Sequence, residues 1–163
     1  MNSLFERVYA KSLEGEGDYK KPVRDVYKFA QNYFKRNFLD RTFKTKEGRD
    51  IKITERGFKE LFFSIAEAMR GGDKGAANVF KSRADDENYW YDVLSIVVEL
   101  DDIIGDMDFE YQKPNYKQFK KPDIEKYVTF SSDVELDGEN HTVMIRVEVP
   151  HEGKPRYYFH YID

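Results

Sequence analysis

The final segment of the chain, residues 127–163, constrains the fold more than any other part of the sequence. It contains three runs in which apolar and polar residues alternate, separated by Asp137-Gly138 and by the stretch from Pro150 to Gly153. Alternation with a period of two is typical of β-strands that bury one face. Asp-Gly between two such runs favours a tight hairpin, because glycine adopts positive φ angles easily. The segment therefore predicts three antiparallel strands in a meander.

Helical spacing dominates the sequence before this segment. Apolar residues recur at intervals of three and four in stretches that begin near Pro22, Glu55 and Asp86. Residues 41–54 predict a small hairpin with a turn at Gly48, whereas the lysine-rich stretch 106–125 predicts an irregular connection. The predicted fold class is α+β, with N-terminal helices, a small β-hairpin and then a C-terminal antiparallel three-stranded meander.

Chain length and local composition predict a single domain preceded by a short arm. A chain of 163 residues is long enough to bury a real core within one domain. Residues 13–21 combine two glycines with many charges, which is typical of a linker or loop. We therefore expect an N-terminal arm at residues 1–21 and a single α+β domain at residues 22–163.

Composition excludes several classes of site. The chain has no cysteine, which rules out disulfides, thiolate zinc sites and a cysteine nucleophile. Three histidines leave little room for a histidine-rich metal site, so we expect no metal and no cofactor. A net charge of −4 lacks the basic balance usual for nucleic-acid-binding domains, although 27 lysines and arginines allow a local basic patch. The apolar stretches are too short to span a bilayer, and no signal peptide is recognisable at the start, so we expect a cytoplasmic protein without membrane contact.

No strong catalytic motif is present, and the looser groupings each have an ordinary alternative. One grouping is acidic and could hold Mg²⁺ through retained waters, or could be a solvated or partner-facing patch. A second is basic and aromatic; it could hold phosphates and stack on unpaired bases, or could be a solubilising loop. The acidic residues are Glu99, Asp101, Asp102, Asp106, Asp108 and Glu110. The basic and aromatic residues are Lys113, Lys117, Lys120, Lys121 and Lys126 with Tyr111, Tyr116, Phe119 and Tyr127.

The third grouping lies on the predicted meander. If Arg146 and His160 share one face of the sheet, they could bracket a phosphodiester. Histidine is a natural acid or base near neutral pH, and the planar fork of arginine matches phosphate oxygens. Tyr158, Ser131 or Thr129 could bind phosphate or assist proton transfer. Ordinary decoration of a solvent-facing sheet explains the same residues, and strand register decides whether the two side chains meet.

Several segments resemble a known family. The stretch from Gly48 to Leu61, the hairpin from Val134 to Val147 around Asp137-Gly138, and the closing Tyr157-Tyr158 strand are similar to a domain of phage and mobile-element polyvalent proteins. That domain is grouped with the barnase, EndoU, colicin and RelE-like nucleases. The resemblance covers roughly residues 40–163 and implies an α+β fold whose sheet face carries the active site.

The resemblance implies metal-independent RNA cleavage in the cytoplasm of a bacterial host, with a 2′,3′-cyclic phosphate as the product. In this interpretation His160 is the acid or base, Arg146 stabilises phosphate charge and Tyr158 assists. The residues expected to hold the RNA backbone are Lys52, Lys59, Arg49 and Ser131.

A non-enzymatic alternative belongs to a different class of function. A small, acidic, cysteine-free phage protein could bind and block a host defence complex through its acidic surface. The residues expected at that interface are Asp101, Asp102, Asp106 and Asp108. The expected partner is therefore RNA in one case and a host protein complex in the other.

Overall fold

The computed structural model describes residues 23–136 and 138–163 of the chain. The arm predicted at residues 1–21 lies outside this described part. The helices, short 3-10 helices (η) and strands follow in the order α2 (Val23–Asn37), β1 (Thr42–Lys44), β2 (Asp50–Lys52), α3 (Glu55–Met69), η1 (Gly75–Val79), η2 (Lys81–Arg83), α4 (Glu87–Ser95), η3 (Ile96–Glu99), α5 (Leu100–Asp106), β3 (Asp108–Pro114), β4 (Ile124–Leu136), β5 (Glu139–Pro150) and β6 (Arg156–Ile162).

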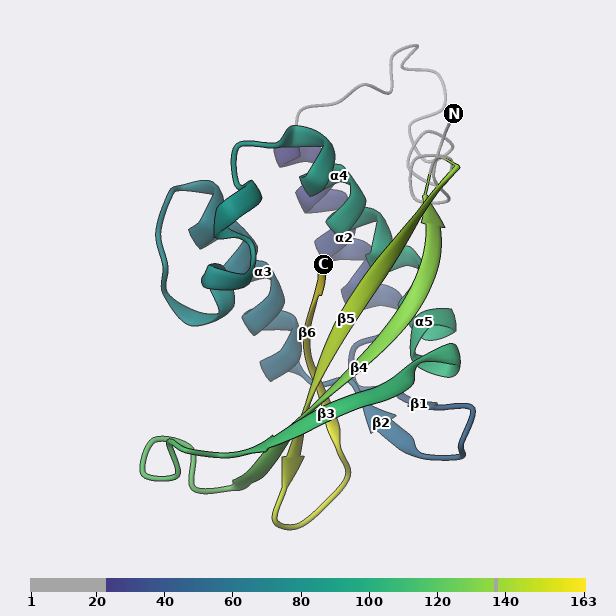
Figure 1. Cartoon of the computed structure of the whole chain (residues 1–163), viewed down its shortest axis with the longest axis vertical. Helices are drawn as coiled ribbons and strands as arrows, with labels where there is room; N and C mark the ends of the chain where they lie inside the picture. The colour runs from purple at the N-terminus through teal and green to yellow at the C-terminus, as the bar shows by residue number, and fades with distance from the viewer. Residues whose placement is uncertain (1–22, 137) are drawn as a thin grey trace.

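All six strands belong to one mixed sheet in the order β1-β2-β6-β5-β4-β3 (Figure 1). Neighbouring strands are antiparallel except β2 and β6, which run parallel and pair through Lys52 and Arg156. The sheet twists strongly and curls into a half-barrel, with helices packed along one side of it. The fold class is α+β with N-terminal helices, as the sequence predicts.

The predicted three-stranded antiparallel meander is wrong as a description of this sheet. Strands β4, β5 and β6 do pair consecutively and antiparallel, but β3 extends the sheet at one edge and the β1–β2 hairpin at the other. Strand β3 lies where we predicted an irregular connection, and every one of its residues is exposed. Because an edge strand needs no buried face and tolerates Pro114 at its end, the usual sequence signs of a strand are weak there.

Helices α2 and α3 pack through the apolar faces that their spacing predicts. Val26, Ala30 and Phe34 of α2 are buried, and the Phe34 ring meets the Phe62 ring of α3 edge-on at 5.9 Å between centroids. Phe34 also contacts the ring of Tyr157 from β6, which joins the helical layer to the sheet. None of the helices in the described residues is long and apolar enough to cross a membrane.

Helix α3 begins in direct contact with the backbone of β6. A Cβ atom at Gly57 would lie 2.3 Å from the carbonyl oxygen of Tyr157, a distance that no side chain tolerates. The absence of a side chain at Gly57 therefore sets how closely α3 approaches the sheet. This approach places Arg56 and Glu60, one turn apart on α3, close to the sheet, where Arg56 forms an ion pair with Glu148 of β5.

Candidate functional site

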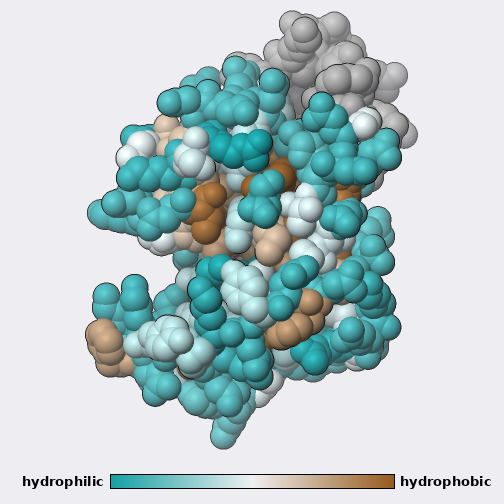
Figure 2. Space-filling model, in the orientation of Figure 1, coloured by the Kyte–Doolittle hydropathy of each residue, from teal (hydrophilic) through white to brown (hydrophobic). Residues whose placement is uncertain are grey.

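A pocket of about 540 Å³ opens between η1 and the loop that joins β3 to β4. Figure 2 shows the molecule hollowed on this side, between the helical layer and that loop. Its floor is the outer face of the sheet, which is the face opposite the buried side chains of Val143, Ile145 and Val147. The volume lies in the range of small-molecule and nucleotide sites. The polar and aromatic side chains that line the pocket include those of Glu60, Tyr111, Lys113, Tyr116, Lys117, Lys120, Lys121, Tyr127, Thr129, Arg146, Tyr158 and Phe159.

A β-bulge aims two neighbouring side chains of β6 into this pocket. Arg146 pairs with Phe159 across the strands, whereas the next residue, Val147, pairs with Tyr157, so Tyr158 is an extra residue on β6. Tyr157 is fully buried in the core, and Tyr158 and Phe159 both line the pocket. Bulges of this kind redirect side chains and are frequent beside functional sites.

The pocket is strongly cationic at its mouth and aromatic along its walls. Its lining residues, all within the described part of the chain, include four lysines and Arg146 against a single carboxylate, Glu60. The guanidinium carbon of Arg146 lies 5.3 Å from the centroid of the Phe159 ring, over its face. Such a lining favours a ligand that carries both negative charge and a planar ring system.

Tyr111, on the exposed edge strand β3, extends this charged surface. Its side chain lies beside Thr129 and Arg146, which line the same pocket. Interaction of the phenol with the Thr129 side chain, together with the positive charges of Arg146 and Lys113, lowers the pKa of Tyr111 below its ordinary value. Tyr111 is therefore more acidic than a free tyrosine and lies where a bound anion would meet it.

At the inner end of the pocket, Lys121 and Tyr158 form a close pair. The Lys121 ammonium donates a hydrogen bond to the Tyr158 hydroxyl at 2.5 Å. Burial lowers the pKa of Lys121, and the nearby charge of Glu148 partly opposes this effect. Burial raises the pKa of Tyr158 instead, so the phenol keeps its proton at neutral pH. The pair combines a lysine of lowered pKa with a neutral hydroxyl in contact with it.

A buried carboxylate, that of Glu148, lies next to this pair and forms an ion pair with Lys121. The Glu148 side chain is 1% exposed, accepts a hydrogen bond from Nη2 of Arg56 at 3.1 Å and lies 2.9 Å from Nε of the same guanidinium in an ion pair. Lys121 and Arg156 approach the same carboxylate at 3.9 and 3.7 Å. Burial raises the pKa of Glu148, and the charge of Arg56 is the main effect that opposes the rise. These contacts tie the loop, α3 and β6 together on β5.

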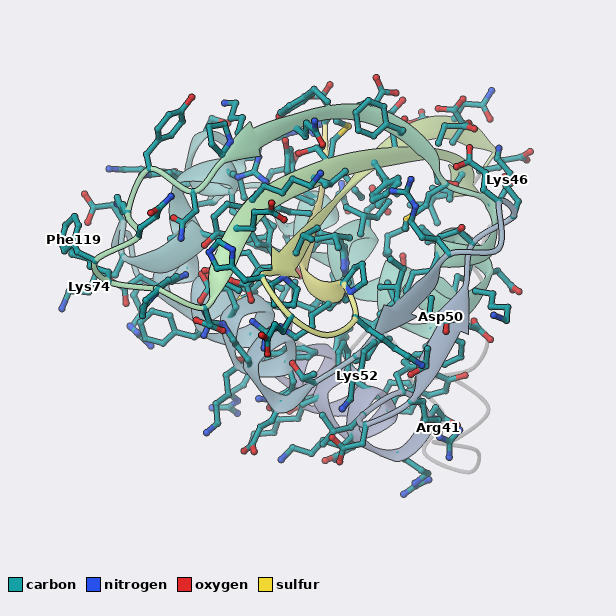
Figure 3. All side chains as sticks on the ribbon, turned by 90° about the horizontal axis from the view of Figure 1, so that it is seen from below. Arg41, Lys46, Asp50, Lys52, Lys74 and Phe119 are labelled. Carbon is teal, nitrogen blue, oxygen red and sulfur yellow. The ribbon has the colours of Figure 1, made fainter. Side chains whose placement is uncertain are left out.

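The β3–β4 loop is held in shape at its base and exposed at its tip. The buried Asn115 side chain donates to the carbonyl oxygens of Lys121 at 2.9 Å and of Ile124 at 3.0 Å. Tyr116 and Phe119 are 78% and 81% exposed in the same loop. In Figure 3, Phe119 projects at the tip, on the same side of the molecule as Lys74, which precedes η1. Two large aromatic rings are thus presented to solvent on either flank of Lys117.

Of the three side chains predicted to act on a phosphodiester, the structure brings two together. Arg146 and Tyr158 both line the pocket. His160 does not, because it pairs with Ile145 on the opposite face of the sheet and is completely buried. Its Nε2 lies 3.1 Å from the carbonyl oxygen of Val93, which can only accept, so Nε2 carries the proton and Nδ1 accepts from the Tyr157 hydroxyl at 2.7 Å. Both ring nitrogens are therefore occupied by contacts within the core.

The four residues predicted to hold the RNA backbone are scattered. Arg49 and Lys52 belong to the β1–β2 hairpin, and Figure 3 shows Lys52 across the molecule from Phe119. Ser131 lies on β4 and donates to the carboxylate of Glu110. Lys59 lies on α3, beside but not in the pocket, where it forms an exposed ion pair with Glu55 at 3.2 Å. The structure therefore gives no common site for this set.

The acidic residues lie on a different part of the surface. Asp101, Asp102 and Asp106 are exposed on α5, and Asp108 at the start of β3 forms an ion pair with Lys46 at 2.5 Å. Across the described residues, no group of three or more histidine or carboxylate side chains is arranged to hold a metal ion. The acidic surface is thus separate from the pocket and has no metal-site geometry.

Seven residues of the predicted basic and aromatic grouping line the pocket, namely Lys113, Lys117, Lys120, Lys121, Tyr111, Tyr116 and Tyr127. The sequence did not give Tyr111 or Lys121 a role of its own within that grouping. Tyr111 lies on the strand that we had predicted as irregular, although Phe109 and Tyr111 alternate with charged residues there. Lys121 stood within a run of lysines, and only the fold distinguishes it from its neighbours. Arg56 and Glu148, far apart in sequence, meet across α3 and β5, and no local pattern signals such a pair.

Comparison with known proteins gives one match. A family model described as large polyvalent protein-associated domain 3 matches residues 21–161. No curated protein and no solved structure matches the chain. The match supports the polyvalent-protein part of the resemblance and does not test the relationship to nucleases. Because it spans most of the chain, this protein belongs to the large polyvalent protein-associated domain 3 family.

Proposed function

We propose that this domain binds single-stranded RNA in the basic and aromatic pocket and cleaves it without a metal ion. One observation carries the proposal: four lysines and Arg146 converge with exposed aromatic rings around a cavity large enough for a nucleotide. Cationic side chains bind the phosphate backbone, and aromatic faces stack on unpaired bases. Tyr116 and Phe119 are exposed enough to take the stacking role, which favours single strands over duplexes.

Arg146 is the group that we assign to the phosphate. Its guanidinium lies over the Phe159 ring and beside Tyr111, and these neighbours position it toward the pocket. A planar guanidinium donates to two phosphate oxygens at once and stabilises the additional negative charge of the transition state. Lys113, which lines the same wall of the pocket, would add a second positive charge.

The Lys121–Tyr158 pair takes the proton-transfer role that the sequence had suggested for His160. With Lys121 neutral, the Tyr158 oxygen accepts the proton of the ribose 2′-hydroxyl while the phenol proton passes to Lys121. The 2′-oxygen then forms a bond to phosphorus, and the bond from phosphorus to the 5′-oxygen breaks. The leaving 5′-oxygen takes the proton of Tyr111, and exchange with solvent returns Lys121 and Tyr111 to their starting states. The products are a 2′,3′-cyclic phosphate and a 5′-hydroxyl.

This proposal predicts that Tyr158→Phe lowers the rate of RNA cleavage by about a hundredfold, because the relay loses its hydroxyl. The measurement is incubation of wild type and variant with mixed single-stranded RNA in EDTA, with the ends of the fragments identified. Tyr33→Phe, on α2 and away from the pocket, is the matched control and should cleave like wild type.

Two outcomes contradict the enzymatic part of the proposal. One is the absence of cleavage by wild type, with or without added Mg²⁺. The other is equal cleavage by wild type and Tyr158→Phe. In either case the protein-blocking alternative gains weight, and Asp101, Asp102 and Asp106 on α5 become the surface to test by charge reversal.

A further inference from the structure

A second hollow, of about 910 Å³, lies on the other side of the Lys121–Tyr158 pair. Its walls come from α2, α3 and the base of the β3–β4 loop. Glu60, Lys120, Lys121 and Tyr158 line both this hollow and the pocket, so the two cavities meet at these residues. Together they form one groove that passes over the Lys121–Tyr158 pair, with the pocket on one side and the α3 surface on the other.

We propose that this second hollow is a binding subsite for the same RNA strand. It holds the part of the strand that continues from the pocket past Lys121. The inference rests on the proposed binding of RNA in the pocket and adds the path and the minimum length of the strand. It predicts that the domain prefers RNA long enough to occupy both cavities. Lys59 and Phe63 of α3 are the side chains that would contact the strand there.

The charges in the second hollow suit a phosphate backbone. Lys59 and Glu55 are about equally exposed, at 70% and 69%, so their ion pair at 3.2 Å contributes little and its ammonium can turn to a phosphate. The Glu60 carboxylate is directed toward η1, where it accepts a hydrogen bond from the backbone nitrogen of Ala76 at 3.1 Å. Lys120 supplies positive charge where the two cavities meet.

An aromatic ring is available in the same place. Phe63 is 48% exposed on α3, although its neighbours Phe58 and Phe62 are buried in the core. Lys59 and Phe63 are four residues apart on the helix, so their side chains project from the same face of α3. A cation beside an exposed ring is the pairing that holds a phosphate and stacks a base. The hollow thus repeats the pairing of a cation with an exposed aromatic ring that is found in the pocket.

The test compares two lengths of RNA on two sets of variants. The probes are fluorescein-labelled 2′-O-methyl oligouridylates of two and eight nucleotides, which cannot form a cyclic phosphate, and the readout is fluorescence anisotropy. We expect Lys59→Glu and Phe63→Ser each to weaken binding of the octamer by roughly tenfold and to leave the dimer unchanged. Lys81→Glu, an exposed charge reversal on η2 outside both cavities, is the control for general electrostatics.

Each result decides one of the two claims. If wild type binds both probes and neither α3 variant changes the affinity for the octamer, the second subsite is wrong and the pocket proposal stands. If Lys59→Glu weakens both probes equally, or no more than Lys81→Glu does, the effect is general charge and the subsite is again excluded. If wild type binds neither probe, the proposed function itself fails and the subsite fails with it.

Discussion

Replacement of Glu148 with alanine is expected to lower the free energy of unfolding by about 3 kcal/mol. The carboxylate is 1% exposed and lies among Arg56, Lys121 and Arg156, all within 4 Å. Its removal leaves these cations close together in a poorly solvated place without the negative charge that balances them. Loss of one partner of a buried ion pair is costly for this reason, whereas loss of a surface pair is not.

Urea unfolding of matched variants measures this effect. Glu55→Ala removes a carboxylate from the exposed pair with Lys59 and should change stability by about 0.5 kcal/mol or less. The double variant Arg56→Met with Glu148→Met should recover much of the loss, because it removes both charges and retains apolar volume. Equal stability of Glu148→Ala and Glu55→Ala would show that the Glu148 cluster does not hold the loop and α3 on the sheet.

A second large effect is expected at acid pH and comes from His160. Burial lowers the pKa of His160 from its ordinary value of 6.5 to about 4. Between these two pH values the unfolded chain takes up a proton at His160 and the folded chain does not, so stability falls as the pH decreases. The loss amounts to roughly 3 kcal/mol between pH 6.5 and pH 4, and it stops below the pKa of the folded state.

Comparison with His160→Gln isolates this contribution, because a glutamine amide can donate to the Val93 carbonyl and accept from Tyr157 but does not titrate in this range. The variant should be less stable than wild type at pH 7 and should lose less of its stability between pH 6.5 and pH 4. Other groups that titrate in this range are common to both proteins and cancel in the difference. Parallel stability curves for the two proteins would contradict the assignment of His160 to the buried core.

The sequence predicts the helices well and the sheet only partly, for physical reasons. Helix α3 is recognisable in the sequence because one of its faces is buried. Burial of that face requires apolar residues at helical spacing, and these are Phe58, Leu61, Phe62 and Ile65. The parallel pairing of β2 with β6 joins distant segments through Lys52 and Arg156, and nothing near either residue specifies it. Strand β3 buries no face at all, so it shows little of the apolar alternation on which strand prediction depends.

The side chains that line the pocket are harder to predict from the sequence than the strands that carry them. Simple alternation along β6 would place Tyr158 and His160 on one face. The bulge opposite Arg146 and Val147 adds one residue to β6, so Tyr158 turns to the pocket and His160 to the core. Two of the three side chains predicted to act on a phosphodiester, Arg146 and Tyr158, line the pocket, as does most of the predicted basic and aromatic grouping. A one-residue irregularity nevertheless decides which side chains of β6 meet there. The bulge lies beside the close contact of Gly57 with the Tyr157 carbonyl oxygen, a long-range contact that the strand's own sequence does not reveal.

The most direct measurement is the affinity of the wild-type protein and of Arg146→Glu for a labelled single-stranded 2′-O-methyl RNA octamer at low salt, with a duplex of the same sequence and chemistry as the comparison. We predict that wild type binds the single strand more tightly than the duplex, and that affinity falls as salt rises because lysines and Arg146 displace counterions from phosphates. Arg146→Glu should weaken binding by at least about tenfold. Absence of binding to the single strand, or equal binding by wild type and Arg146→Glu, would contradict RNA binding in the pocket.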